Sequence, residues 1–141
     1  MSSIKKTELV MFAKNGESTF DLYKTKIAPF IKSDLFVESW RRGNGIPLSS
    51  NCHSKYKLIN VQYVKLKFEN KYVGNVLWKY SEDHSKWLIS EDSEKAFICI
   101  VDLNRMLSQN KRGGGAVCIR DASIWKLFHD SIAAIETCIK L

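Results

Sequence analysis

The segment Asp83-His84-Ser85-Lys86, followed by Trp87, is the part of this chain best suited to chemistry. Its histidine and lysine stand two residues apart, a spacing that would place both side chains on one face of a β-strand. An imidazole can attack phosphorus, and an adjacent ammonium can hold a phosphate oxygen. Together with Asn104 and the run Gly113-Gly114-Gly115, this pair suggests phosphodiester cleavage.

A mixed α/β fold is predicted to position these residues. Apolar patterns indicate strands over 8–13, 35–40, 56–68, 87–90 and 96–103, and the last is apolar enough to be central. Helical spacing indicates helices over 18–31 and 121–139, with Ser18 or Thr19 as the first N-cap. We therefore expect an α+β arrangement, a mixed sheet flanked by helices, in a single domain over residues 1–141.

Charge and composition limit the partners. The net charge of +7 favours a polyanion such as nucleic acid, although it also suits an ordinary soluble surface. Because no apolar run approaches the ~18 residues of a membrane span, we expect no membrane partner. Residues 1–6 lack the apolar core of a signal peptide.

The four cysteines are widely spaced and form no Cys-x-x-Cys pair, so their pattern does not predict a zinc site. They fit two disulfides, for which three pairings are possible, or four reduced cysteines in a cytosolic core. These residues are Cys52, Cys99, Cys118 and Cys138.

Several ordered motifs resemble the C-terminal signature of the deoxyribonuclease II family. They begin with Glu82-Asp83-His84-Ser85-Lys86-Trp87 and continue through 99–105, 112–118 and the tryptophan-bearing segment 125–128. Shorter matches at 12–14, 21–23 and 50–52 fall in family order. The resemblance covers about Glu8 to Cys138 and corresponds to the C-terminal half of such an enzyme.

The resemblance implies one half of a phospholipase D-like, pseudo-dimeric fold in which each half contributes one His-x-Lys motif. It implies an acid endodeoxyribonuclease that uses no metal or other cofactor. One histidine forms a phosphohistidine, the other protonates the leaving 5′ oxygen, and water releases a 3′-phosphate end. By the same resemblance, the protein is expected to be lysosomal or secreted, although no signal peptide is visible in this chain.

The family pattern also assigns roles to individual positions. His84 is the catalytic histidine of this half and Lys86 its phosphate-binding partner. Asn104, Gly114 and Arg112 are predicted to bind substrate. The family disulfides would pair Cys52 with Cys138 and Cys99 with Cys118.

The second His-x-Lys motif leaves two interpretations open. It could come from an N-terminal half or from another copy in a homodimer, giving an active nuclease. Alternatively, the chain is an inactive DNA-binding or effector half-domain derived from that nuclease. His53-Ser54-Lys55 has the same spacing, but it lies where the family has no catalytic motif, so we predict a surface role for it.

Overall fold

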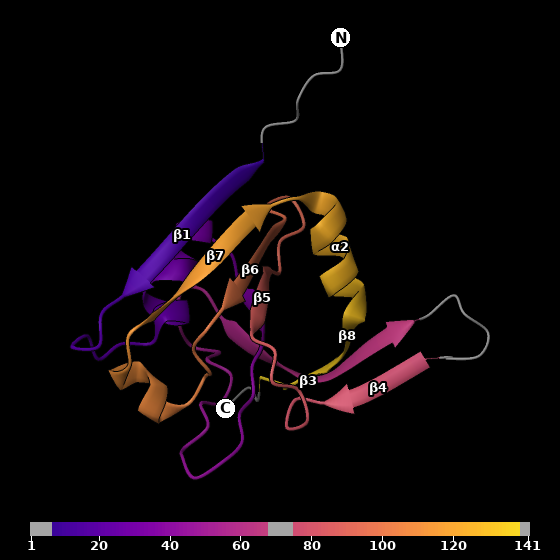
Figure 1. Cartoon of the computed structure of the whole chain (residues 1–141). Helices are drawn as coiled ribbons and strands as arrows, with labels where there is room; N and C mark the ends of the chain where they lie inside the picture. The colour runs from indigo at the N-terminus through magenta and orange to yellow at the C-terminus, as the bar shows by residue number, and fades with distance from the viewer. Residues whose placement is uncertain (1–6, 68–74, 139–141) are drawn as a thin grey trace.

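The computed structural model describes residues 7–67 and 75–138. Within them, an eight-stranded mixed sheet has the order β1-β7-β6-β5-β2-β3-β4, with β8 paired to β3 (Figure 1). The strands are β1 (Glu8–Lys14), β2 (Leu35–Glu38), β3 (Leu58–Lys67), β4 (Asn75–Lys79), β5 (Trp87–Ser90), β6 (Phe97–Val101), β7 (Gly114–Arg120) and β8 (Ile132–Ile135). The helical elements are the π-helical turn η1 (Tyr23–Ile27), α1 (Ala28–Ile31), the 3₁₀ turn η2 (Leu107–Lys111) and α2 (Ala122–Ser131). The expected α+β class is confirmed.

Helices cover the sheet on both faces. On one face, η1 and α1 pack against buried residues of β2, β6 and β7, including Leu35, Val37 and Cys99. On the other face, Trp125 of α2 packs with Trp87 and Ile98. Because both faces of the sheet are covered at its middle, β5 is buried along its whole length. This burial agrees with its mostly apolar sequence.

Both predicted helices need correction. The first comprises η1 and α1, and Asp21 caps its start instead of Ser18 or Thr19: the Asp21 carboxylate accepts hydrogen bonds from the backbone N–H groups of Tyr23 (2.9 Å) and Lys24 (3.3 Å). The last helix, predicted to reach residue 139, ends at Ser131, and the chain continues as β8. Pairing with β3 therefore overrides the helical spacing of the apolar residues there.

Two disulfides join segments of the fold, and both have the predicted pairing. Cys99 and Cys118 face each other across β6 and β7, with Cα atoms 4.0 Å apart. Cys52 and Cys138 join the segment before β3 to the segment after β8. Among the described residues no cysteine is free.

Candidate active site at one end of the sheet

The predicted catalytic motif lies at one end of the sheet but not on a strand. Residues 83–86 are irregular and lead directly into β5, so His84 and Lys86 do not share a strand face. Asp83 shapes this segment: its Oδ1 accepts the Ser85 N–H at 2.8 Å, and its Oδ2 accepts the Trp78 Nε1–H at 3.0 Å. The motif is thus fixed by an aspartate that binds both the backbone and a neighbouring strand.

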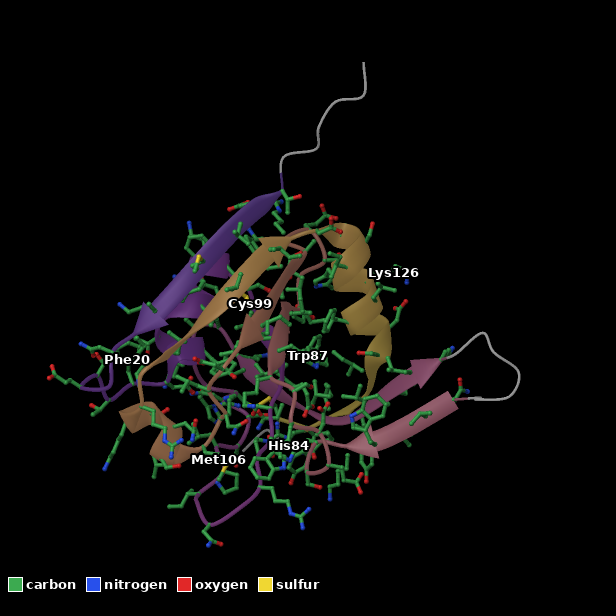
Figure 2. The ribbon with its side chains drawn as sticks, in the orientation of Figure 1. Phe20, His84, Trp87, Cys99, Met106 and Lys126 are labelled. Carbon is green, nitrogen blue, oxygen red and sulfur yellow. A yellow bond between two sulfur atoms is a disulfide. The ribbon has the colours of Figure 1, made fainter. Side chains whose placement is uncertain are left out.

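His84 is exposed and lies against an aromatic ring. Its imidazole stacks on the indole of Trp40, with centroids 4.2 Å apart and planes inclined by 27°. The Trp40 Nε1–H donates to the Ser81 carbonyl at 3.2 Å, which fixes the indole against the same loop. Neither imidazole nitrogen has a hydrogen-bond partner within residues 7–67 and 75–138, so both are open to a substrate. Figure 2 shows His84 at the lower end of the sheet.

Lys86 contacts His84 through the backbone. Its Nζ donates to the backbone carbonyl of His84 at 2.8 Å instead of projecting from a strand face. The Lys86 side chain is half-buried. The local hydrogen bond therefore fixes the ammonium against the backbone of His84.

Asn104 is brought to the same end of the sheet by the end of β6. The Val101 N–H donates to the Lys86 carbonyl at 2.9 Å, which joins the end of β6 to the motif. Just after Asn104, the Arg105 N–H donates to Ser39 Oγ at 3.1 Å, next to Trp40. The Asn104 Oδ1 is buried, and no hydrogen-bond partner for it is found among the described residues.

Arg105, which the sequence did not single out, anchors this loop from inside. Its guanidinium donates to Asn60 Oδ1 and to the Ser49 carbonyl (3.2 Å) and lies 3.7 Å from Asp21 Oδ2. Burial lowers the pKa of Arg105, and the charge of Asp21 opposes that shift. The run 99–105 pointed to this position, but only packing reveals its anchoring role.

Gly114 and Arg112 lie at the same end, where β7 begins. A Cβ on Gly114 would lie 2.5 Å from Asp102 Oδ1 and 2.7 Å from Leu103 Cγ, so close packing alone requires this glycine. Arg112 is exposed, and its carbonyl accepts a hydrogen bond from Lys14 Nζ at 2.7 Å. Contact of either residue with substrate stays a prediction.

A buried carboxylate beside this end was not foreseen. Glu38, the last residue of β2, is fully buried, and neither carboxylate oxygen has a hydrogen-bond partner within the described chain. Burial raises its pKa to about 8; Arg41 opposes the shift and Asp83 adds to it. Arg41 itself lies over the Tyr80 ring at 4.1 Å and donates to the Val61 carbonyl at 2.9 Å. Glu38 is consequently neutral in acid.

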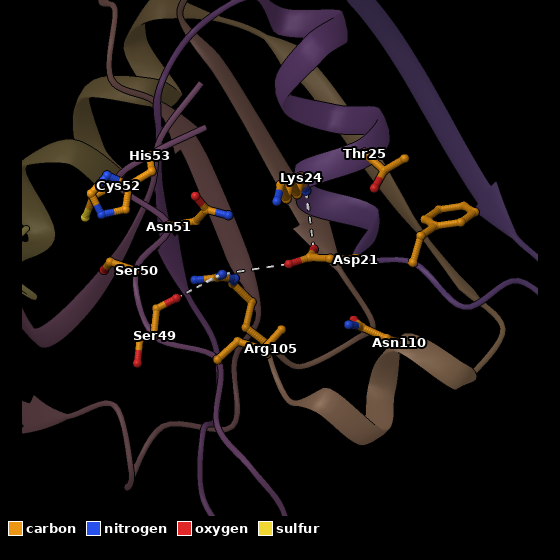
Figure 3. A pocket seen from close by; sticks show the side chains of 12 residues that line it. Asp21, Lys24, Thr25, Ser49, Ser50, Asn51, Cys52, His53, Arg105 and Asn110 are labelled. Atoms are coloured by element: carbon orange, nitrogen blue, oxygen red, sulfur yellow. Dashed lines mark hydrogen bonds and ion pairs between the residues drawn. The ribbon is translucent and has the colours of Figure 1, made fainter. Parts of the chain in front are cut away.

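A cavity of about 600 Å³ opens beside Arg105, on the side of η1 (Figure 3). His53 contributes to its wall, whereas His84 and Lys86 do not. His53 is exposed, as predicted. Among the residues that the structure describes, no three His, Cys, Asp or Glu side chains gather as a metal site, and no helix is long and apolar enough to span a membrane.

Comparison with known proteins gives consistent matches over nearly the whole chain. The family model described as deoxyribonuclease II matches residues 1–138. The chain is 42% identical to deoxyribonuclease-2 of Caenorhabditis elegans over 118 residues, which are 83% of this chain and 29% of that protein. It is 40% identical to plancitoxin-1 of Acanthaster planci over 129 residues, 92% of this chain and 34% of the relative. Identity to cell-death-related nuclease 7 of C. elegans is 31% over 138 residues, 98% and 36% of the two chains. The chain thus spans about a third of the length of these relatives.

Proposed function

Because this chain belongs to the deoxyribonuclease II family, we propose that it supplies one part of the active site of an acid endodeoxyribonuclease. One histidine attacks phosphorus, the bond from phosphorus to the 5′ oxygen breaks, and a histidine of the second part protonates that oxygen. Water then attacks the phosphohistidine and leaves a 3′-phosphate end. The observation that carries the proposal is the exposed His84 imidazole, stacked on Trp40, in a segment where the Lys86 ammonium binds the backbone carbonyl of the same histidine.

Each nearby group has a role that its environment supports. Trp40 holds the imidazole of His84 from one side. The Lys86 ammonium stabilises the charge on the nonbridging oxygens, and the Asn104 amide positions the phosphate. Arg112 and the backbone at Gly114 bind the neighbouring strand of DNA. In this scheme cationic side chains, and not a metal, offset the developing negative charge.

An uncovered apolar strip supports docking of a second part that brings the other His-x-Lys motif. Met11, Val117 and Ile100 stand opposite one another on β1, β7 and β6 and are 73%, 44% and 56% exposed. They continue toward Trp87 and a cavity of about 410 Å³ that is also lined by Ser85. Because the relatives are about three times longer, we assign this strip to the remainder of the family polypeptide. Alternatively, a second copy of this chain binds the strip, and a measurement of the oligomeric state would then show a homodimer.

Two features support an acidic compartment outside the cytosol, such as the lysosome or the secretory route. The disulfides persist under oxidising conditions. Glu38 is buried without a partner for its oxygens, an arrangement that stabilises the fold best while its carboxyl is protonated.

The alternative is a half-domain that binds DNA, or acts as an effector, without cleaving. The contact that favours it is the hydrogen bond between Lys86 Nζ and the His84 carbonyl, because an ammonium engaged there is less available to a phosphate.

The test is incubation of supercoiled plasmid with the purified chain, alone and together with the separately expressed remainder of a family polypeptide, at acid pH in EDTA, across a protein concentration series. Light scattering records the oligomeric state, and labelling identifies the new ends. We expect nicks with 3′-phosphate ends that increase with formation of the assembly. DNA binding without nicking, at every concentration and in every oligomeric state, would support the inactive half-domain instead.

A further inference from the structure

Two neighbouring cavities lie on the η1 and α1 side of the sheet, and together they are called the groove below. The first, of about 600 Å³, and the second, of about 300 Å³, share Lys24 in their walls. The first is bounded by His53 and Arg105, and the second by Ser54 and Lys55. The segment 53–55 therefore lies along the groove, although the site at His84 does not use it. Figure 3 shows Lys24 and His53 around the first cavity.

The groove is strongly basic. Lys24, Lys32, Lys55 and Arg105 line it, and Asp21 is the one carboxylate among its described lining residues. That carboxylate is already engaged, because it accepts two backbone N–H groups and lies 3.7 Å from the Arg105 guanidinium.

The three lysines carry charge that the described fold does not neutralise. All are exposed, and none forms an ion pair with a carboxylate among residues 7–67 and 75–138. Lys55 Nζ lies over the Tyr56 ring at 5.4 Å, a contact that leaves its charge available. Like charges lining one groove repel each other, and an anion that lies among them relieves this repulsion.

Other groups in the groove suit a nucleic acid strand better than a lone anion. Phe20 and Tyr56 offer aromatic surfaces, and Asn51 and Asn110 offer amide donors and acceptors. Arg105 connects the groove to the candidate site, because it follows Asn104 directly in the chain and reaches the cavity wall.

We propose that this groove binds the phosphodiester backbone of DNA beyond the scissile bond, with Lys24, Lys32 and Lys55 contacting successive phosphates. His53-Ser54-Lys55 is then a phosphate-binding segment and not a second catalytic motif. The inference rests on the proposed function for the identity of the polyanion. The groove thereby extends the contact between the protein and the DNA strand that is bound at His84.

The test measures binding of a fluorescent DNA oligonucleotide by anisotropy at several salt concentrations. The groove variant carries Lys24→Ala, Lys32→Ala and Lys55→Ala. A matched variant carries Lys67→Ala, Lys95→Ala and Lys126→Ala, which remove the same charge from positions lining neither cavity. Circular dichroism and thermal melting confirm that both variants are folded.

We expect the groove variant to lose about tenfold or more in affinity and to lower the slope of log K against log salt by about 2 to 3, since each phosphate contact contributes roughly 0.7–0.9. The matched variant should change affinity less than about threefold. Equal losses in both variants, no loss in the groove variant, or no binding by the unmodified chain would overturn the inference.

Acetylation footprinting of the unmodified chain gives an independent readout. Bound oligonucleotide should protect Lys24, Lys32 and Lys55 but not Lys126, and protection of Lys126 alone would contradict the groove. Plasmid nicking, measured in parallel, separates the two proposals. Groove-dependent binding without nicking would contradict the proposed nuclease activity and support DNA binding by the groove. Nicking by the natural chain, with both rate and affinity unchanged in the groove variant, would support the nuclease activity and contradict the groove.

Discussion

The imidazole of His84 stacks on the indole of Trp40, with ring centroids 4.2 Å apart. This contact joins the loop before β5 to the segment that leaves β2, two parts of the chain that are adjacent only in the folded sheet. The indole is held in turn by its hydrogen bond to the Ser81 carbonyl. The orientation of the candidate catalytic group therefore depends on a residue that is remote in sequence.

Replacement of Trp40 tests this positioning role. Trp40→Ala removes the ring contact, which is worth about 0.5–1.5 kcal/mol, so we expect kcat for plasmid nicking to fall about 2- to 10-fold with KM little changed. Trp40→Phe keeps an aromatic face and should restore most of the rate. Equal kcat in all three proteins would show that the stack does not position His84.

Glu38 makes stability depend on pH. Its pKa is raised from the ordinary 4.5 to about 8, so between these values the unfolded chain releases a proton that the folded chain keeps. The free energy of unfolding should therefore fall as pH rises through this window, by at most about 1.4 kcal/mol per pH unit. The contribution is fully present below pH 4.5 and lost above pH 8.

Urea unfolding of the natural chain and of Glu38→Gln, from acid to pH 8.5, measures this effect. Because glutamine does not titrate, the difference between the two curves isolates Glu38. We expect the variant to lack the decline between about pH 4.5 and 8. Parallel curves would mean that the carboxyl titrates normally.

The two disulfides should differ in accessibility. Cys99 and Cys118 are fully buried, whereas Cys52 and Cys138 are half-buried, so a mild reductant should open Cys52–Cys138 first. This bond closes 86 residues, and its loss should cost about 4–5 kcal/mol in the chain-entropy model, against about 3 kcal/mol for the 19-residue separation of the other. Alkylation mapped by mass spectrometry, followed by urea unfolding, checks the order and the size of the losses. Alkylation of Cys99 before Cys52 would contradict it.

Gly115 is required for the contact between β7 and β1. A Cβ there would collide with the Phe12 carbonyl oxygen of the neighbouring strand, which cannot move without shifting the backbone. We expect Gly115→Ala to lower the free energy of unfolding by about 1–3 kcal/mol. Gly16→Ala is the matched control, since its Cβ would meet nothing closer than Gly113 N at 3.6 Å. A Gly115→Ala protein as stable as the control would refute this packing argument.

The sequence predicted the fold class and most strands because strands with apolar residues on both faces, such as β5 and β6, are recognisable as short apolar runs. It missed β7, whose first residues are glycines and resemble a turn. Their glycine character reflects close approach to the Phe12 carbonyl, Asp102 and Leu103, which only the paired structure reveals. It also missed β8, because pairing with β3 ends a helix that local spacing would have continued.

The candidate site likewise contains residues that the sequence could predict and residues that it could not. His84, Lys86 and Asn104 could be named from motif order, and the structure places all three at one end of the sheet. His84 and Lys86 do not share a strand face, since the motif ends one residue before β5 begins. Glu38 could not have been found, because its burial depends on packing across several strands.

The most direct test of the account compares the two His-x-Lys motifs within one protein. The initial rate of plasmid nicking at acid pH in EDTA is measured for the natural chain, His84→Ala and His53→Ala at equal concentration and oligomeric state. We expect nicking to be lost in His84→Ala and retained in His53→Ala. Nicking that survives in His84→Ala, or that is lost in His53→Ala, would contradict it. So would an absence of nicking by the natural chain at every concentration, both alone and with the remainder of the family polypeptide supplied.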